Sequence, residues 1–230
     1  MSRRRTEWLT EMGLAPVWRL RSGASPEPAA PPLPAAGGSR EQQILQLDWT
    51  DLKARVAACT DCKLRASCKQ TVFGVGDEHA QWMLVGEAPG AEEDRLGEPF
   101  VGQAGRLLDS MLAAIDLKRG ADVYIGNVLK CRPPGNRNPE LEEVAACSPY
   151  LLRQIELIRP KLILAMGRFA AQTLLDTAAT IASLRGTVHR YAGVPLIVTY
   201  HPAYLLRNLP DKAKAWADLR FAVRTMEGLK

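Results

Sequence analysis

The sequence predicts an α/β fold with a parallel sheet covered by helices on both faces, and two observations support this prediction. Short, almost wholly apolar runs alternate along the chain with longer segments of helical periodicity, which is the pattern of strand–helix–strand units. The apolar runs do not alternate with polar residues, so both faces of each strand are expected to be buried. No internal repeat interrupts this order.

The individual elements follow from these patterns. The first helix is expected over residues 49–58, because Trp49, Leu52 and Val56 fall on one face, and it runs directly into Cys59. Buried strands are expected at Trp82–Val85, Val123–Leu129, Leu162–Ala165 and Leu196–Thr199. Helical spacing predicts helices at Leu107–Ile115, Leu141–Ile158, Arg168–Leu175 and Lys212–Met226.

The chain divides into three parts. Residues 1–22 predict a short N-terminal helical arm around Trp8 and Met12. Residues 23–41 are rich in Pro, Ala and Gly, a composition that cannot bury a core and is typical of a linker. The folded domain is expected over residues 42–230. The arm either docks on a protein partner or packs on the domain, and we favour a protein partner.

Charge and hydropathy restrict the class of protein. The formal net charge is +5, but the first 40 residues hold six arginines against three glutamates, so a DNA-binding surface would be a local patch. No apolar stretch approaches the roughly 20 residues of a membrane-spanning helix. No apolar run follows the N-terminal arginines as it would in a targeting signal. We therefore expect a cytoplasmic protein without a membrane partner.

Five cysteines in such a chain indicate metal ligation rather than disulfides. Cys59 and Cys62 form a Cys-x-x-Cys pair, Cys131 follows the second expected strand, and Cys147 lies in the next helix. Four cysteines at these places hold either zinc or a [4Fe–4S] cluster, and spacing alone does not separate the two. The simpler alternative is that Cys131 and Cys147 are ordinary buried residues. Cys68 is either a buried free thiol, which we favour, or a replacement for one of the four.

Three loops, each just past an expected strand, carry the chemistry. The carboxyl ends of parallel strands meet at one edge of a sheet, so the three loops are expected to form one ligand site. They read Gly86-Glu87-Ala88-Pro89-Gly90 continuing to Pro99-Phe100-Val101-Gly102-Gln103-Ala104-Gly105, then Asn127-Val-Leu-Lys130-Cys131-Arg132-Pro133-Pro134, then His201-Pro-Ala-Tyr204-Leu205-Leu206-Arg207.

These loops resemble the signature motifs of family 4 uracil-DNA glycosylases, and the resemblance covers about residues 48–226. It implies a three-layer α/β/α fold with a central four-stranded parallel sheet. It implies a monomeric, monofunctional enzyme that flips uracil out of DNA and hydrolyses the N-glycosidic bond, which starts base excision repair. It also implies a [4Fe–4S] cluster in place of zinc, on the ligands Cys59, Cys62, Cys131 and Cys147.

The resemblance assigns roles around the flipped base. Phe100 stacks on the uracil ring, Asn127 reads its O4 and N3–H, and Glu93 lies against C5, where thymine carries a methyl group. His201 donates to O2 of the departing uracil anion. Ala88 stands where better-known uracil glycosylases have a water-orienting Asp. The attacking water is therefore expected to be oriented by the side chain of Glu87 or by the backbone carbonyls of Glu87 and Ala88.

The resemblance also suggests a DNA-binding surface. The loop with Leu205 and Arg207 is similar to one that enters the minor groove and fills the gap left by the flipped base. Phosphate contacts are expected from the backbone amides of Gly102 and Gly105 and from the side chains of Lys130, Arg132 and Arg137.

Two rival functions remain on the sequence alone. One is a relative that traps uracil covalently through a histidine-bearing loop after the second strand, but residues 132–139 contain no His. The other is a cluster-bearing DNA-binding module without activity.

Overall fold

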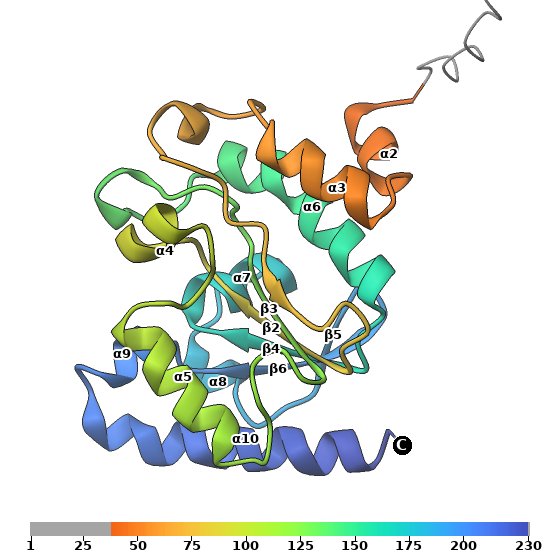
Figure 1. Cartoon of the computed structure of the whole chain (residues 1–230). Helices are drawn as coiled ribbons and strands as arrows, with labels where there is room; N and C mark the ends of the chain where they lie inside the picture. The colour runs from red at the N-terminus through yellow and green to blue at the C-terminus, as the bar shows by residue number, and fades with distance from the viewer. Residues whose placement is uncertain (1–37, 230) are drawn as a thin grey trace, which may run out of the picture. The chain divides into compact units, whose positions relative to one another are not determined.

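Four parallel strands form the centre of the sheet in the computed structural model, which describes residues 38–229 (Figure 1). They lie in the order β3 (Val123–Asn127), β2 (Trp82–Gly86), β4 (Leu162–Met166), β6 (Val194–Thr199). The predicted α/β class is therefore confirmed, and each predicted strand is present within a few residues.

Two further strands flank the four predicted ones, so the whole sheet has six. Strand β1 (Val75–Gly76) pairs antiparallel with β3 at one edge, and β5 (His189–Tyr191) pairs antiparallel with β6 at the other. Strand β1 has only two residues, and β5 is only partly buried, so neither leaves an apolar run in the sequence.

Helices cover both faces of this sheet, and alternate residues of each strand face opposite layers. Met83 and Val85 of β2 pack in one core with α6 (Leu141–Ile158) and α7 (Arg168–Leu175). Trp82 and Leu84 pack in the other core with α5 (Gln103–Ala113) and α10 (Lys212–Glu227). Among residues 38–229, no helix is both long enough and apolar enough to cross a membrane.

Helical structure is already present at Arg40, inside the segment predicted as linker. Helix α2 (Arg40–Leu45) is capped by the side chain of Ser39, and Arg40 donates to the Ala146 carbonyl of α6. With α3 (Trp49–Ala57), it packs a small third core against Tyr150. Residues 40 and 41, predicted as the end of the linker, therefore belong to α2, and the predicted arm over residues 1–22 and the linker up to residue 37 lie outside the described residues.

Several short helices were not predicted from the sequence. They are η1 (Lys63–Ala66), α4 (Ala91–Leu96), η2 (Pro134–Asn136), α8 (Ile181–Leu184), α9 (Pro202–Leu205) and η3 (Leu209–Asp211). Each is too short to show a helical period in the sequence. Two of them, α4 and α9, flank the site described next.

The strand order reverses at β2, which has β3 on one side and β4 on the other. In open parallel sheets, ligands bind outside the carboxyl ends of the strands at such a reversal. The loops that follow β2 and β3 both start there.

Candidate active site

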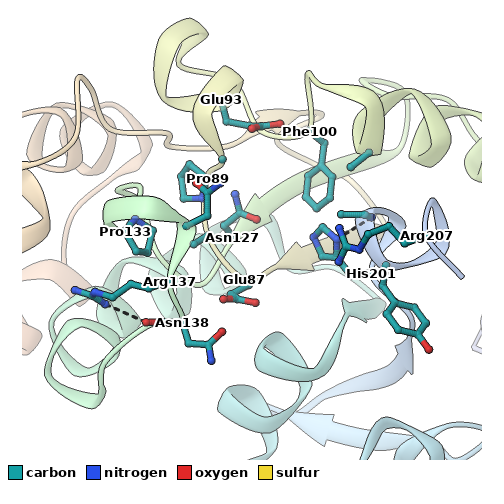
Figure 2. A pocket seen from close by; sticks show the side chains of 16 residues that line it. Glu87, Pro89, Glu93, Phe100, Asn127, Pro133, Arg137, Asn138, His201 and Arg207 are labelled. Carbon is teal, nitrogen blue, oxygen red and sulfur yellow. Dashed lines mark hydrogen bonds between the residues drawn. The ribbon is translucent and has the colours of Figure 1, made fainter.

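One cavity of about 460 Å³ lies at these strand ends. The loops after β2, β3 and β6 all contribute to it, as the sequence predicts, and Figure 2 shows their side chains around a common space. The residues that line it are Glu87, Ala88, Pro89, Gly90, Glu93, Phe100, Ala104, Asn127, Pro133, Asn136, Arg137, Asn138, His201, Ala203, Tyr204 and Arg207.

Asn127 ends strand β3 and is only 2% exposed. Its Oδ1 atom is buried and has no hydrogen-bond partner among the described residues. An unpaired buried acceptor costs about 1–3 kcal/mol, and such groups are rare in native proteins. The Asn127 carbonyl Oδ1 therefore indicates a site for a ligand that donates a hydrogen bond.

Phe100 and His201 lie beside this amide. Their rings stack with centroids 5.4 Å apart and an angle of 28° between the planes. A Cβ atom on Gly86 would clash with Asn127 Oδ1 and would lie 2.8 Å from Phe100 Cζ. The bare backbone of Gly86 therefore allows the amide and the phenyl ring to occupy the same corner of the cavity (Figure 2).

His201 is held in one tautomer. Its Nδ1 accepts a hydrogen bond from the Ala203 backbone N–H at 3.1 Å, which leaves Nε2 to carry the ring proton in the neutral form. Burial lowers the pKa of His201 to about 4; Glu93 opposes this shift and Arg207 adds to it. At neutral pH the imidazole is therefore an uncharged donor through Nε2.

Phe100 has a strained backbone. Its φ is 55°, in the left-handed region that residues other than glycine rarely adopt. This conformation costs of order 1–3 kcal/mol and is found mainly at functional sites.

Glu93 on α4 holds the segment that follows Phe100. Its Oε1 accepts hydrogen bonds from the backbone N–H groups of Val101 at 3.1 Å and Gly102 at 3.4 Å. Glu93 also lines the cavity. This contact with the backbone was not expected from the sequence.

Glu87 follows β2 and lines the cavity, where burial raises the pKa of its carboxyl group above the ordinary value. The nearby charge of Arg168 opposes this shift. The backbone carbonyl of Glu87 accepts from the Leu129 N–H at 3.0 Å, and the neighbouring Ala88 packs against one of the cores. Arg168 had no predicted role, although it lies two residues past the end of β4, where the carboxyl ends of the strands form the site.

Two residues predicted to contact DNA, Leu205 and Lys130, are buried in the structure. Leu205 is 1% exposed and packs in the core with Leu219, because α9 turns this side chain inward. Its neighbour Leu206 is 39% exposed, beside Arg207 at the mouth of the cavity. Lys130 is 1% exposed, and its Nζ donates to the Asn127 backbone carbonyl and to Gln154 Oε1. Lys130 therefore cannot reach a phosphate.

Other predicted phosphate contacts have partners within the protein. The guanidinium of Arg137 forms two hydrogen bonds with the buried Glu143, at 2.9 and 2.6 Å. Arg132 Nε donates to Asn136 Oδ1 at 2.7 Å. The Gly102 amide donates to Glu93, as described above. Gly105 is buried, and a Cβ atom there would collide with the Phe100 carbonyl, so a phosphate contact at the two glycines is not supported.

The four predicted cysteine ligands line a second cavity. Cys59 and Cys62 come from the loop after α3, Cys131 follows β3, and Cys147 comes from α6, with its Sγ accepting from the Lys130 backbone N–H at 3.3 Å. Within residues 38–229, no three His, Cys, Asp or Glu side chains gather closely enough to hold a single metal ion. Four thiols around one cavity form a donor set that suits either zinc or an iron–sulfur cluster.

Known proteins give an independent comparison. The family profile described as the uracil DNA glycosylase superfamily matches residues 73–220. The chain is 48% identical over 164 residues to a type-4 uracil-DNA glycosylase of Archaeoglobus fulgidus, covering 68% of this chain and 82% of the relative. It is 46% identical over 162 residues to one of Thermotoga maritima, covering 70% and 84%. A type-5 uracil-DNA glycosylase of Pyrobaculum aerophilum is 35% identical over 192 residues, covering 70% and 84%.

Proposed function

The chain belongs to the uracil DNA glycosylase superfamily and is a uracil-DNA glycosylase of base excision repair, and from that premise we propose that it flips uracil out of DNA and hydrolyses its N-glycosidic bond without a covalent protein–DNA intermediate. The observation that carries the proposal is the buried, unpaired Oδ1 of Asn127 beside Phe100 and His201. A flipped uracil offers this acceptor a donor, its N3–H.

Recognition of uracil rests on Asn127. Its amide accepts from N3–H and donates to O4, and cytosine reverses both groups. Two mismatched buried partners at about 1–3 kcal/mol each give roughly 2–6 kcal/mol of discrimination. Phe100 supplies a flat apolar face for the ring. Glu93 lies against C5 and excludes the methyl group of thymine, with its carboxylate fixed by the amides of Val101 and Gly102.

Bond cleavage leaves negative charge on uracil and an oxocarbenium-like sugar. His201 donates through Nε2 to O2 of the uracil anion, where charge develops in the transition state. A neutral imidazole suits this role, because it is fixed in the donating tautomer by Ala203. The Glu87 carboxylate holds the attacking water and faces the positive sugar, with the Ala88 carbonyl as a further acceptor.

DNA binds across the mouth of the cavity. Leu206 takes the gap-filling role in the minor groove because it is exposed next to Arg207, and Leu205 is not. Arg207 contacts phosphates, and so does Arg132 through its Nη groups, since its bond to Asn136 uses only Nε. Arg137, paired with Glu143, orients the loop after β3.

Uracil release tests this function. Labelled uracil-containing DNA is incubated with the protein and treated with alkali, which breaks the strand at abasic sites. We expect strand breaks that depend on uracil, and no protein–DNA band on a denaturing gel. Intact strands would contradict the glycosylase reaction, and a persistent band would contradict hydrolysis in favour of covalent trapping.

We further propose that Cys59, Cys62, Cys131 and Cys147 hold a [4Fe–4S] cluster. When bound, the cluster joins the loop after α3, the loop after β3 and helix α6, and so braces the strand that carries Asn127. It has a structural role here, and no step of the reaction passes through it.

Substitution of one ligand tests this cluster. Cys131→Ser is expected to lose most of the roughly four irons per chain, together with the visible charge-transfer absorption. Cys68→Ser is the control, because Cys68 lies against Cys131 but does not line the cavity that the four ligands share, and it is expected to keep both signals. Stoichiometric zinc in the wild-type protein, or iron loss in Cys68→Ser alone, would contradict this ligand set.

A further inference from the structure

The strained backbone of Phe100 is held by a residue outside the cavity. Arg119 lies in the turn between α5 and β3, and its side chain is 23% exposed. Its Nη1 donates to the Pro99 carbonyl at 2.9 Å and its Nη2 to the Phe100 carbonyl at 2.8 Å. Its Nε donates to Asp109 on α5 at 3.0 Å. The planar guanidinium thus donates hydrogen bonds to two successive carbonyls and one carboxylate at once.

The opposite side of the same segment is held by Glu93. Its carboxylate takes the next two N–H groups, those of Val101 and Gly102. Gly105 allows α5 to approach the Phe100 carbonyl closely, since any side chain there would collide with that oxygen. The left-handed turn at Phe100 is therefore fixed from two sides. The guanidinium of Arg119 binds the two carbonyls, and the carboxylate of Glu93 binds the two amides that follow.

We propose that Arg119 is a positioning residue for uracil recognition, which fixes the left-handed turn at Phe100 and so holds the phenyl ring ready to stack on the base. The role in uracil recognition rests on the proposed function, whereas the contacts of Arg119 that fix the turn do not. Arg119 does not line the cavity, so its effect reaches the base only through the backbone of Phe100.

An ordinary ion pair with Asp109 is the competing explanation. Asp109 is 51% exposed, and exposed ion pairs contribute little. A lysine at position 119 keeps the charge and this ion pair, but its single ammonium lacks the flat fork that serves both carbonyls. The comparison of Arg119→Lys with Arg119→Gln therefore separates charge from geometry.

A matched control lies on the other side of the domain. Arg153 also donates to a backbone carbonyl, that of Leu47, and to an exposed carboxylate, that of Glu156, and its side chain is 19% exposed. Arg153→Gln removes one carbonyl contact and one carboxylate contact of the same kinds without touching the turn at Phe100.

Two readouts are measured on the full-length, cluster-containing protein. Hydrogen exchange at residues 97–103 is expected to become about 10-fold faster in Arg119→Gln, as expected for the loss of charged hydrogen bonds. KM for uracil-containing DNA and the inhibition constant of free uracil are expected to rise by about the same factor, while kcat changes much less. Arg119→Lys is expected to resemble Arg119→Gln, and Arg153→Gln to resemble wild type. If Arg119→Gln does not fold, Arg119→Lys carries the test.

Different results would overturn the role of Arg119 and the proposed function. Wild-type exchange at residues 97–103 in both Arg119 variants overturns the proposal, and so does full rescue by lysine. Faster exchange with unchanged KM and uracil inhibition also overturns it, because the turn would then not position the ring. If wild-type protein releases no uracil, the proposed function fails, and the exchange data alone still decide whether Arg119 holds the turn.

Discussion

Replacing Asn127 with alanine is expected to lower kcat/KM on uracil-containing DNA by at least about 30-fold, since the change leaves two polar groups of the buried base unpaired at about 1–3 kcal/mol each. The amide is 2% exposed, so water cannot easily take its place. The measurement is the rate of abasic-site formation under single-turnover and steady-state conditions.

Asn138 provides the control for this prediction. It is an asparagine that lines the same cavity away from the stacked rings (Figure 2). Asn138→Ala is expected to cost far less than Asn127→Ala. If Asn138→Ala abolished uracil release while Asn127→Ala kept nearly wild-type activity, the base would lie on the other side of the cavity.

Replacing His201 with alanine is expected to lower kcat by about 10²–10³-fold, the usual cost of losing one donor to a developing oxyanion. KM is expected to change little, because the interaction strengthens only as charge builds on O2. His201→Asn separates this role from capping, since Asn can still accept from the Ala203 N–H but has no ring Nε2. His189→Ala, outside the cavity, should behave as wild type.

The pH profile gives a second check on His201. Because burial lowers its pKa to about 4, the imidazole stays neutral through the neutral range and is protonated only in acid. The part of kcat that depends on His201 is therefore expected to stay constant through the neutral range and to change only near pH 4, where a proton on Nδ1 ends its hydrogen bond from the Ala203 N–H. A kcat that decreases as the pH rises through the neutral range, and does so only when His201 is present, would mean that a protonated imidazole is required.

The central strands and the main site residues could be predicted because they follow from one geometric rule. Parallel strands buried on both faces appear as apolar runs, and their carboxyl ends share an edge. Asn127 and His201 follow such runs directly, so their side chains come together in the structure. The edge strand β5 has no apolar run, and no pattern in the sequence marks it.

The remaining site features depend on backbone direction. Nothing in the sequence indicates that Phe100 has a positive φ, so the need for Arg119 could not be foreseen. Helix α9 has four residues, too few for a periodic pattern to show whether Leu205 or Leu206 faces the core. Lys130 was predicted to bind phosphate because it precedes Arg132 in the loop after β3. Its Nζ instead donates to the buried backbone carbonyl of Asn127 and to the side chain of Gln154.

A crystal structure of the protein with free uracil tests the central claim most directly. A uracil ring is expected against the face of Phe100, with N3–H and O4 paired to the Asn127 amide and O2 within hydrogen-bond distance of His201 Nε2. Uracil bound elsewhere, or bound in this cavity with Asn127 Oδ1 still unpaired, would contradict it.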